Sequence, residues 1–283
     1  MNKVVACIDD SPRAAVVCDF AIWASRLLDV KLEFLHVLDR HPERASVSDY
    51  SGAIGIDSHE SLLEQLSALD EERSKLAQEH GRQILQAARQ RAESAGVSAV
   101  DTLQRHGALA ETLLDLEPET RLVVMGQHEH AGVSRWYLDQ NAERVVRSLQ
   151  RPVMVVNGAY KAPERFVIAF DASATATKMV QMVAGSPLLK GLDCHLLVAG
   201  DPGASVRDSL ALARETLESE GFAVTEAVRP GEAEQVIRDY VVECQADVLV
   251  MGAYGHSRIR HLIMGSTTST LLRTSPVSML VLR

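Results

Sequence analysis

The sequence is poor in aromatic residues and contains no long apolar run. Phe, Trp and Tyr together make up 4% of the 283 residues, although hydrophobic residues as a whole reach 46%. An apolar core must therefore be built mainly from Val, Leu, Ile, Ala and Met. No apolar stretch approaches the roughly 20 residues that a transmembrane helix needs, so we expect no membrane association. The amino-terminal stretch MNKVVACIDD has no signal-peptide core, which predicts a cytoplasmic protein.

Positive charge and cysteine are also scarce. The chain has 29 Lys and Arg against 38 Asp and Glu, a net charge of −9. Because nucleic-acid surfaces need concentrated Lys and Arg, we predict no nucleic-acid partner. No two of the four cysteines form a C-x-x-C pair, and we expect inert reduced thiols rather than a disulfide, metal or redox site. These cysteines are Cys7, Cys18, Cys194 and Cys244.

The chain repeats itself in four landmarks that occur in the same order in each half. KVVACIDDSPRAAVVCDFAIWAS near the start matches RFVIAFDASATATKMVQMVAGS from residue 165, so that Asp9 and Ser11 correspond to Asp171 and Ser173. KLEFLHVLD matches DCHLLVAGD, with Val37 placed opposite Val198. RLVVMG then matches DVLVMG, and RPVMVVNG matches SPVSMLVL. The repeat predicts two domains, residues 1–158 (the first half) and 162–283 (the second half).

Each half alternates short apolar runs with helical patterns, which predicts a parallel sheet covered by helices on both faces. The predicted strands are residues 3–9, 31–37, 99–106, 121–126 and 152–156, then 165–170, 192–199, 222–229, 246–251 and 277–282. The predicted helices are residues 13–28, 60–95, 109–117 and 140–149, then 174–188, 204–220, 232–244 and 266–274. The fold class is therefore α/β, with five strands in each half.

The helix over residues 60–95 is much longer than its counterpart in the second half. Its apolar residues recur at multiples of three and four, which predicts a solvated helix packed on the sheet through one stripe. A partner-binding or coiled-coil seam is the alternative, although the stripe is not sustained over enough heptads. The stripe consists of Leu62, Leu66, Leu69, Leu76, Ile84 and Ala88.

The closing stretch VLVMGAYGHSRIRHLIMGSTTSTLLRTSPVSMLVLR combines a strand, a glycine-punctuated loop and a Ser/Thr-rich helix start. No Lys follows the glycines, so it is not a P-loop. Glycine allows close backbone approach to a ligand, and a helix N-terminus offers free amides to an anion. Hydroxyls at Ser266, Thr267 and Thr268 add donors, and Asp171 could accept hydrogen bonds from a base or sugar. A simple turn followed by an N-capped helix is the alternative interpretation.

These residues resemble the universal stress protein family in its tandem two-domain form. The family's motif, G-x2-G-x9-G-[S/T], stands here as Gly252, Gly255, Gly265 and Ser266. Asp171 matches the family's aspartate after the first strand, and Val198 matches its adenine-side valine. The resemblance covers nearly the whole chain and implies two Rossmann-like domains forming an intramolecular pseudo-dimer, with the last strands of the two halves paired. It also implies that ATP, with or without Mg²⁺, binds in the second half. Met251, at the end of the fourth predicted strand of that half, is a further predicted site residue because it lies at the same sheet edge.

The first half departs from this pattern in MGQHEHAGVSRWYLDQNAERVV. Gly126 is kept, but Glu129 stands where the second glycine would be. Counting back from the Pro before the final strand makes this loop two residues longer and places Asn141 and Ala142 opposite Gly265 and Ser266. Glu143 would then follow at the helix start, where a carboxylate repels phosphate. We therefore expect no ATP, or only a weak ligand, in the first half.

Histidines and arginines near the two loops invite other interpretations. His128 and His130 with Glu129 could supply metal ligands, but no third ligand is identifiable by spacing, so we predict no metal site. His36 and His106 would contribute only if the fold brought them near. In the second loop we expect surface charges, although an arginine could reach a phosphate tail. The residues of that loop are His256, Arg258, Arg260 and His261.

The leading hypothesis is a cytoplasmic regulatory protein of the stress response that binds one ATP in its second half and has an unidentified signalling partner. A slow ATPase or phosphotransferase is a second hypothesis, although no water-positioning group or Mg²⁺ site is evident near the γ-phosphate. A ligand-free interaction scaffold is a third. We predict no catalytic residues, and further association into a homodimer is left open.

Overall fold

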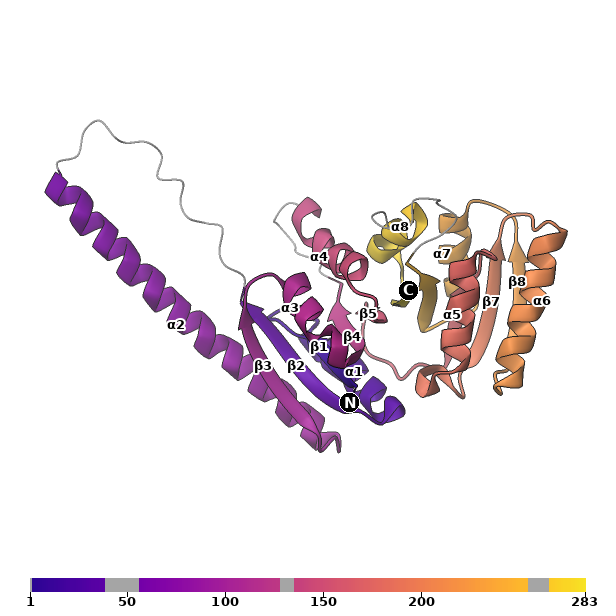
Figure 1. The fold of residues 1–283 in the computed structure, drawn as a ribbon, viewed down its shortest axis with the longest axis horizontal. Helices are drawn as coiled ribbons and strands as arrows, with labels where there is room; N and C mark the ends of the chain where they lie inside the picture. The colour runs from indigo at the N-terminus through magenta and orange to yellow at the C-terminus, as the bar shows by residue number, and fades with distance from the viewer. Residues whose placement is uncertain (1, 39–55, 128–134, 254–264) are drawn as a thin grey trace.

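The computed structural model describes residues 2–38, 56–127, 135–253 and 265–283, and for residues 56–66 and 135–141 it describes the backbone alone. Its strands form one ten-stranded sheet in the order β3-β2-β1-β4-β5-β10-β9-β6-β7-β8 (Figure 1). The strands of the first half are β1 (Lys3–Cys7), β2 (Lys31–Leu38), β3 (Val100–His106), β4 (Thr120–Gly126) and β5 (Val153–Val156). Those of the second half are β6 (Arg165–Ala169), β7 (Asp193–Ala199), β8 (Val224–Arg229), β9 (Val248–Gly252) and β10 (Ser278–Leu282).

Every described strand pair within a half is parallel, and each half repeats the same strand order. The predicted two tandem α/β domains, each with five strands, are therefore confirmed. The helices of the first half are α1 (Ala14–Leu28), α2 (Ile56–Ser94), α3 (Leu109–Leu116) and α4 (Arg135–Ser148). Those of the second half are α5 (Ala174–Ala184), α6 (Ala204–Ser219), α7 (Ala233–Glu243) and α8 (Ser266–Thr274). Short 3₁₀ turns lie at Glu117–Glu119 and Pro187–Leu189.

The two halves meet where β5 and β10 pair in antiparallel fashion at the centre of the sheet. Leu280 lies opposite Met154, with Met279 opposite Val155 and Val281 opposite Val153. This pairing confirms the predicted intramolecular pseudo-dimer. It also means that neither of these two strands is left as an exposed sheet edge, which would otherwise invite association with other chains.

Both faces of the sheet carry a core that continues across the junction. Residues of α1, α2, α5 and α6 pack on one face, where Met154 and Leu280 lie side by side with the other buried apolar residues. Residues of α3, α4, α7 and α8 pack on the opposite face, together with Val155 and Met279. Alternate side chains of a strand point to opposite faces, so each central strand contributes to both cores. The layers are thus helix, sheet and helix throughout.

The long helix α2 is only partly packed on the sheet. Figure 1 shows it projecting well beyond the ends of β2 and β3. Near its C-terminal end Leu85 and Ala88 are 5% exposed, whereas Leu69 and Leu76 are 51% and 65% exposed. The prediction that the whole apolar stripe packs on the sheet is therefore wrong for its described outer part, because the sheet ends before the helix does. Side chains of Leu62 and Leu66 lie outside the described residues.

Three helix ends differ from the prediction by four residues or more, and the first is the start of α2 at Ile56, four residues before the predicted start. α4 begins at Arg135, five residues before the predicted start, and α5 ends at Ala184, four residues before its predicted end. Ser186 begins a 3₁₀ turn by accepting a hydrogen bond from the backbone N–H of Leu188, and Pro187 provides its first residue. Within the described residues, none of the helices combines the length and apolarity that crossing a lipid bilayer would require.

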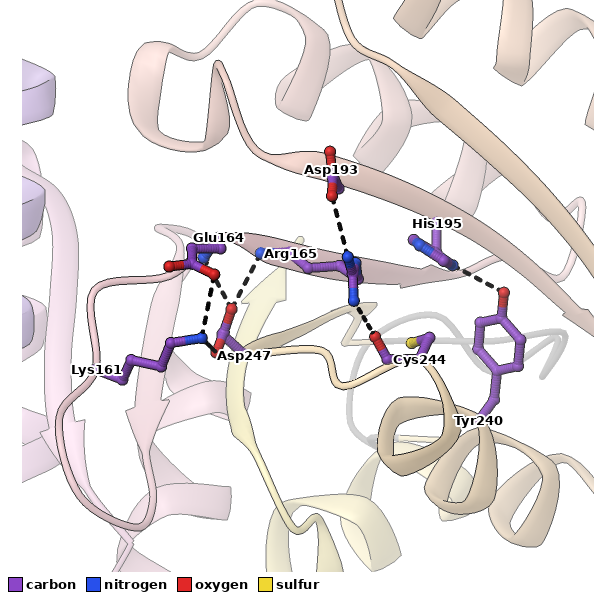
Figure 2. Close-up of polar contacts among 8 residues, drawn as sticks. All are labelled: Lys161, Glu164, Arg165, Asp193, His195, Tyr240, Cys244 and Asp247. Carbon is purple, nitrogen blue, oxygen red and sulfur yellow. Dashed lines mark hydrogen bonds and ion pairs between the residues drawn. The ribbon is translucent and has the colours of Figure 1, made fainter.

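The segment between the halves is tied to the amino ends of the second-half strands by a polar cluster (Figure 2). Asp247 accepts hydrogen bonds from the backbone N–H groups of Glu164 and Arg165, at 2.8 and 3.0 Å. Lys161 lies 3.4 Å from the same carboxylate. Arg165 in turn pairs with Asp193 at 3.2 Å. These contacts hold the segment between the halves at the edge opposite the strand carboxyl ends, so the cluster has a structural role.

His195 belongs to the same edge and is partly buried against α7. Its Nδ1 lies 2.8 Å from the hydroxyl of Tyr240, and Figure 2 shows the two side chains directed toward each other. Burial lowers the pKa of His195 below its ordinary value of 6.5, and the charge of Arg165 lowers it further, against an opposing effect of Asp193. Folding therefore favours the neutral imidazole.

The position at which α2 leaves the sheet can be tested by two matched substitutions. Leu85→Ala should destabilise the protein by about 2–4 kcal/mol, because it opens a cavity in the core. Leu76→Ala should change the free energy of unfolding by less than about 0.5 kcal/mol, because an exposed side chain loses little on truncation. Urea unfolding of both variants measures the difference. Equal losses would show that the outer part of α2 packs against something.

His195 should make the protein less stable in mild acid. Its pKa is near 6.5 in the unfolded chain and lower in the folded one, so its contribution is fully present above 6.5 and is lost as the pH falls from 6.5 through the folded value. His195→Gln should therefore flatten the dependence of unfolding free energy on pH between about 7 and 5. Comparison at about pH 8, where the imidazole is neutral in both states, isolates the packing cost of the substitution. If His195→Gln leaves the slope of unfolding free energy against pH unchanged, the lowered pKa of His195 in the folded protein is contradicted.

Candidate functional site

A cavity of about 480 Å³ lies at the carboxyl ends of β6, β7 and β9. Its volume falls within the range of about 300–1,000 Å³ that is usual for small-molecule sites. The structure brings together in its lining every predicted site residue except Gly255, which lies outside the described residues. The predicted residues in the lining are Asp171, Val198, Met251, Gly252, Gly265, Ser266, Thr267 and Thr268.

The place of the cavity follows from the strand order. β6 lies between β7 and β9, so the chain leaves β6 toward one side of the sheet and later returns on the other. The connections diverge at this point, and in open parallel sheets ligands bind in the crevice that results. The cavity therefore has an α5 and α6 wall, represented by Ala176 and Val206, and an α7 wall, represented by Ala233 and Ile237.

The start of α8 presents backbone amides at the cavity. Gly265 is the N-cap, with φ −57° and ψ 141°, and its carbonyl accepts the first helical hydrogen bond from the amide of Ser269 at 3.0 Å. The amides of residues 266–268 therefore come before the first intrahelical bond. The first turn contains no acidic residue, so the positive end of the helix dipole is uncompensated by side-chain charge. Since the φ of Gly265 is ordinary, its missing side chain contributes space rather than unusual backbone geometry.

Thr268 has a different role from the predicted one. Its hydroxyl donates a hydrogen bond of 3.0 Å to the carbonyl oxygen of Gly252, and the residue is buried. That proton is already engaged, so Thr268 fastens the start of α8 to the end of β9 instead of offering a hydroxyl to a ligand. Ser266 and Thr267 remain as the hydroxyl-bearing residues at the cavity.

The Asp-x-Ser motif makes the same side-chain to backbone hydrogen bond in both halves, although only the second half has a positive φ at the middle residue, Ala172. Asp171 accepts a hydrogen bond from the backbone N–H of Ser173 at 3.0 Å, as Asp9 does from Ser11. Ser173 then caps α5 by accepting from the amide of Ala176. The recurrence of this motif therefore reflects a turn that each half needs at the end of its first strand. The second half additionally places Asp171 in the cavity lining.

Strand register shows why the first half differs. Gly126 pairs with Val156 as Gly252 pairs with Leu282, so the loop and helix between these strands together have the same number of residues in each half. The position of Gly265 is then occupied by Asp139, and that of Ser266 by Gln140. The predicted alignment of Asn141 and Ala142 with the motif was wrong by two residues, because Pro152 and Pro276 are not equivalent positions. Burial agrees with the new register, since Val145 and Val146 are buried as Leu271 and Leu272 are.

The helix of the first half runs straight through the position that α8 leaves open. α4 starts at Arg135, so residues Asp139 and Gln140 lie inside the helix. Backbone amides at that place are already hydrogen-bonded within the helix and are not available to an anion. At this position the first half therefore lacks the open helix N-terminus with which α8 begins.

Glu143 was predicted to lie at a helix start, but it lies inside α4. Its carboxylate pairs with Arg147 at 3.3 Å in the same helix and with Arg273 of α8 at 3.4 Å. The predicted repulsion of phosphate by Glu143 is therefore replaced by another role. Glu143 links α4 to α8 across the two halves.

In the first half, His36 occupies the position that corresponds to Val198 of the cavity lining. Since Lys3 pairs with Lys31 and Arg165 with Asp193, His36 rather than Val37 is equivalent to Val198. The predicted pairing was wrong by one residue, which moves a side chain to the opposite face of the sheet. The His36 ring is buried, with Nδ1 2.9 Å from the carbonyl oxygen of Ile8.

Helix α2 closes over this ring at Gly81. A methyl group at Gly81 would lie 2.6 Å from Cδ2 of His36 and 2.2 Å from Nε2 of Gln104, so only glycine allows the helix this close. The corresponding α6 wall in the second half stands back from Val198 and leaves the cavity between them. The space beside Val198 in the second half is thus filled by the His36 ring in the first half.

The remaining sequence-based candidates do not assemble into a site within the described residues. No group of three or more His, Cys, Asp or Glu residues there could hold a metal ion. His106 lies near Gln78 instead, with their nitrogens 3.4 Å apart. His128, Glu129, His130 and the predicted surface-charge loop with His256, Arg258, Arg260 and His261 lie outside the described residues.

The cysteines are unbridged thiols. Burial raises the pKa of Cys7, Cys18 and Cys194 to about 12, and that of Cys244 is raised for the same reason. The reactive thiolate form is therefore disfavoured at neutral pH in all four.

Sequence reasoning missed the residues that form the walls of the cavity. Ala176, Val206 and Ile237 are ordinary apolar residues of helix faces, and the sequence does not distinguish a core position from a cavity lining. Asp201 and Pro202 follow β7 and also line the cavity. Their place after a buried strand could have suggested them, because loops at strand carboxyl ends gather at one edge.

Comparisons with known proteins agree with the observed architecture. The sequence model described as the universal stress protein family matches residues 1–157 and 163–283. Universal stress protein Slr1230 of Synechocystis is 33% identical over 289 residues, covering 100% of both chains. A solved universal stress protein from Archaeoglobus fulgidus covers 100% of this chain and 96% of its own, with 18% identity and a TM-score of 0.68. A further one from that organism, solved with dAMP, covers 42% of this chain and 97% of its own, with 19% identity and a TM-score of 0.35.

Proposed function

This chain belongs to the universal stress protein family, and from that premise we propose that it is a cytoplasmic regulatory protein that holds one ATP in its second half. The observation that carries the proposal is the start of α8, whose amides open into a cavity lined by both apolar and polar residues. A nucleotide has the complementary character, because it combines an apolar base with a strongly anionic phosphate chain.

The proposed orientation follows from where the cavity is polar. The phosphates would accept hydrogen bonds from the first-turn amides of α8 and from Ser266 and Thr267. The base would lie toward Val198 and Val206, with Asp171 near the nucleoside end. Mg²⁺, where present, would arrive bound to the phosphates.

We propose holding of ATP rather than hydrolysis. The carboxylates in the cavity lining, Asp171 and Asp201, belong to the segments after β6 and β7, whereas the phosphate-binding helix follows β9. A water-positioning group for hydrolysis would have to lie beside the terminal phosphate. The ligand would instead act as a signal read by a partner protein, and the identity of that partner and any association of chains stay predictions.

The first half should bind no ATP. α4 occupies the position at which a phosphate would meet free amides, and His36 occupies the base side. We therefore propose a stoichiometry of one nucleotide per chain.

Equivalent substitutions in the two halves test the proposed phosphate site. Ser266→Glu should weaken ATP binding by about tenfold or more, because a carboxylate at the first helical position repels phosphate. The same charge favours a helix N-terminus, so the fold should be retained. Gln140→Glu places the identical side chain at the equivalent position inside α4 and should leave binding unchanged. Isothermal titration calorimetry with ATP measures affinity and stoichiometry together.

The outcomes separate the competing functions. Two ATP molecules per wild-type chain would contradict the assignment of the first half. Failure of ATP, ADP and AMP to bind at millimolar concentration would favour a ligand-free scaffold. Steady conversion of ATP to ADP during long incubation with Mg²⁺, lost in Ser266→Glu, would establish an ATPase.

The base side can be tested by giving the second half the residue of the first. Val198→His should abolish measurable ATP binding, because an imidazole would occupy the space proposed for the base. The fold should tolerate it, since His36 occupies the equivalent position and reaches the carbonyl of Ile8. Val198→Ala leaves the cavity open and should keep affinity within about fivefold of wild type. Circular dichroism checks both folds, and equal affinities would place the base elsewhere.

A further inference from the structure

A buried glutamine crosses from the first half to the far end of α8. Gln127 directly follows β4, is 7% exposed, and donates a hydrogen bond of 2.8 Å from Nε2 to the carbonyl oxygen of Leu272. Leu272 lies in the last turn of α8, where carbonyl groups lack intrahelical donors. The side chain therefore satisfies one of the carbonyls that the helix leaves open at its C-terminal end.

A second contact from the first half supports the same end of the helix. Asn157 donates from Nδ2 to the carbonyl oxygen of Ser275, the C-cap of α8, at 2.8 Å. Its own oxygen accepts a hydrogen bond of 2.8 Å from Nη1 of Arg13, which belongs to the start of α1. The amide is thereby fixed in the orientation that presents its donor to α8.

Comparison with the other half shows that this arrangement is asymmetric. Strand register makes Asn157 equivalent to Arg283, whose Nη1 donates to the carbonyl oxygens of Leu149 and Arg147 at the end of α4, at 2.9 and 2.7 Å. Gln127, however, is equivalent to Ala253, whose side chain has no donor. The additional buried side-chain amide, that of Gln127, therefore contacts α8, the helix whose N-terminus lies at the cavity.

The far end of α8 matters to its near end because the helix is short. Nine residues span roughly 13 Å, so a tilt at Leu272 moves the amides at Ser266 almost rigidly. Donors at the C-terminal carbonyls also offset the negative end of the helix dipole. Both effects bear on the geometry and charge that the first-turn amides present to the cavity.

We propose that Gln127, assisted by Asn157 and Arg13, is a positioning brace through which the first half sets the nucleotide affinity of the second. The inference rests on the proposed function, since it concerns the affinity of that same site. It gives the half without a phosphate site a role in binding. Because coupling between sites is reciprocal, nucleotide in the second half also strengthens the contact at Gln127.

The test removes the donor while preserving volume. In Gln127→Met the carbonyl of Leu272 loses its buried partner, and we expect the amides of α8 to exchange with solvent about fivefold faster in the ligand-free protein. The amides of α4 should be unaffected. Arg283→Ala is the matched control and should have the opposite pattern, with faster exchange in α4 and unchanged exchange in α8. Hydrogen exchange read by mass spectrometry resolves the two helices.

Nucleotide affinity is the second measurement. Gln127→Met should raise the dissociation constant for ATP by about fivefold, while Arg283→Ala should leave it unchanged. A lower melting temperature with unchanged affinity would show a merely structural role and overturn the brace. So would equal exchange rates for α8 in Gln127→Met and the wild type. Gln127→Ala replaces the methionine variant if the latter does not fold.

The two proposals fail in different ways. If wild-type protein binds ATP and Gln127→Met binds it equally well, the brace is refuted and the proposed function stands. If the wild type binds no nucleotide, the proposed function fails and the role in affinity falls with it. In that case exchange in the ligand-free protein still decides whether Gln127 holds α8.

Discussion

The antiparallel pairing of β5 with β10 is the contact on which the rest of the structure depends. These strands are the last of their respective halves, and each would be the edge of a five-stranded sheet on its own. Their side chains are buried on both faces, so separation would expose apolar surface from both cores as well as an unpaired strand edge. The two halves are consequently one body, and each half contributes side chains to the helix ends of the other. Arg283 of the second half donates a hydrogen bond at the end of α4, and Asn157 of the first half does the same at the end of α8.

The shared scaffold accommodates two halves that differ at the carboxyl ends of their strands. The Asp-x-Ser turn persists at Asp9 because it organises the exit from β1, whether or not a cavity follows. In α4 the amides that α8 leaves free are bonded within the helix, and the His36 ring beneath Gly81 fills the space that corresponds to the cavity at Val198. Each change replaces a cavity by packing or by internal hydrogen bonds, which stabilises the half in which it occurs. Divergence of this kind needs no compensation in the other half.

Much of the fold could be predicted from the sequence, because the strands are short apolar runs and the repeat checks each assignment twice. The predictions were least accurate where residues of the first half had to be aligned with residues of the second half without knowledge of the strand register. Val37 was aligned with Val198 by their shared residue type, although pairing of β1 with β2 places His36 there. Pro152 and Pro276 were similarly taken as equivalent, although pairing with β4 and β9 shifts them by two residues. Register is decided by hydrogen bonding between distant strands, which local patterns do not contain.

The exposure of the outer part of α2 and the hydrogen bond of Thr268 also could not be predicted from the sequence, because both depend on elements distant along the chain. An apolar stripe gives the face of a helix but not the length of sheet available to cover it, so Leu76 was predicted to be packed. A hydroxyl at a helix start can serve a ligand or a neighbouring strand, and in Thr268 the carbonyl of Gly252 takes it. The candidate site is thus composed of two kinds of residue that a motif cannot separate. One kind holds the helix start in place, and the other is left facing the cavity. Affinity would depend on both, since amides offered to an anion are useful only where the helix that carries them is held still.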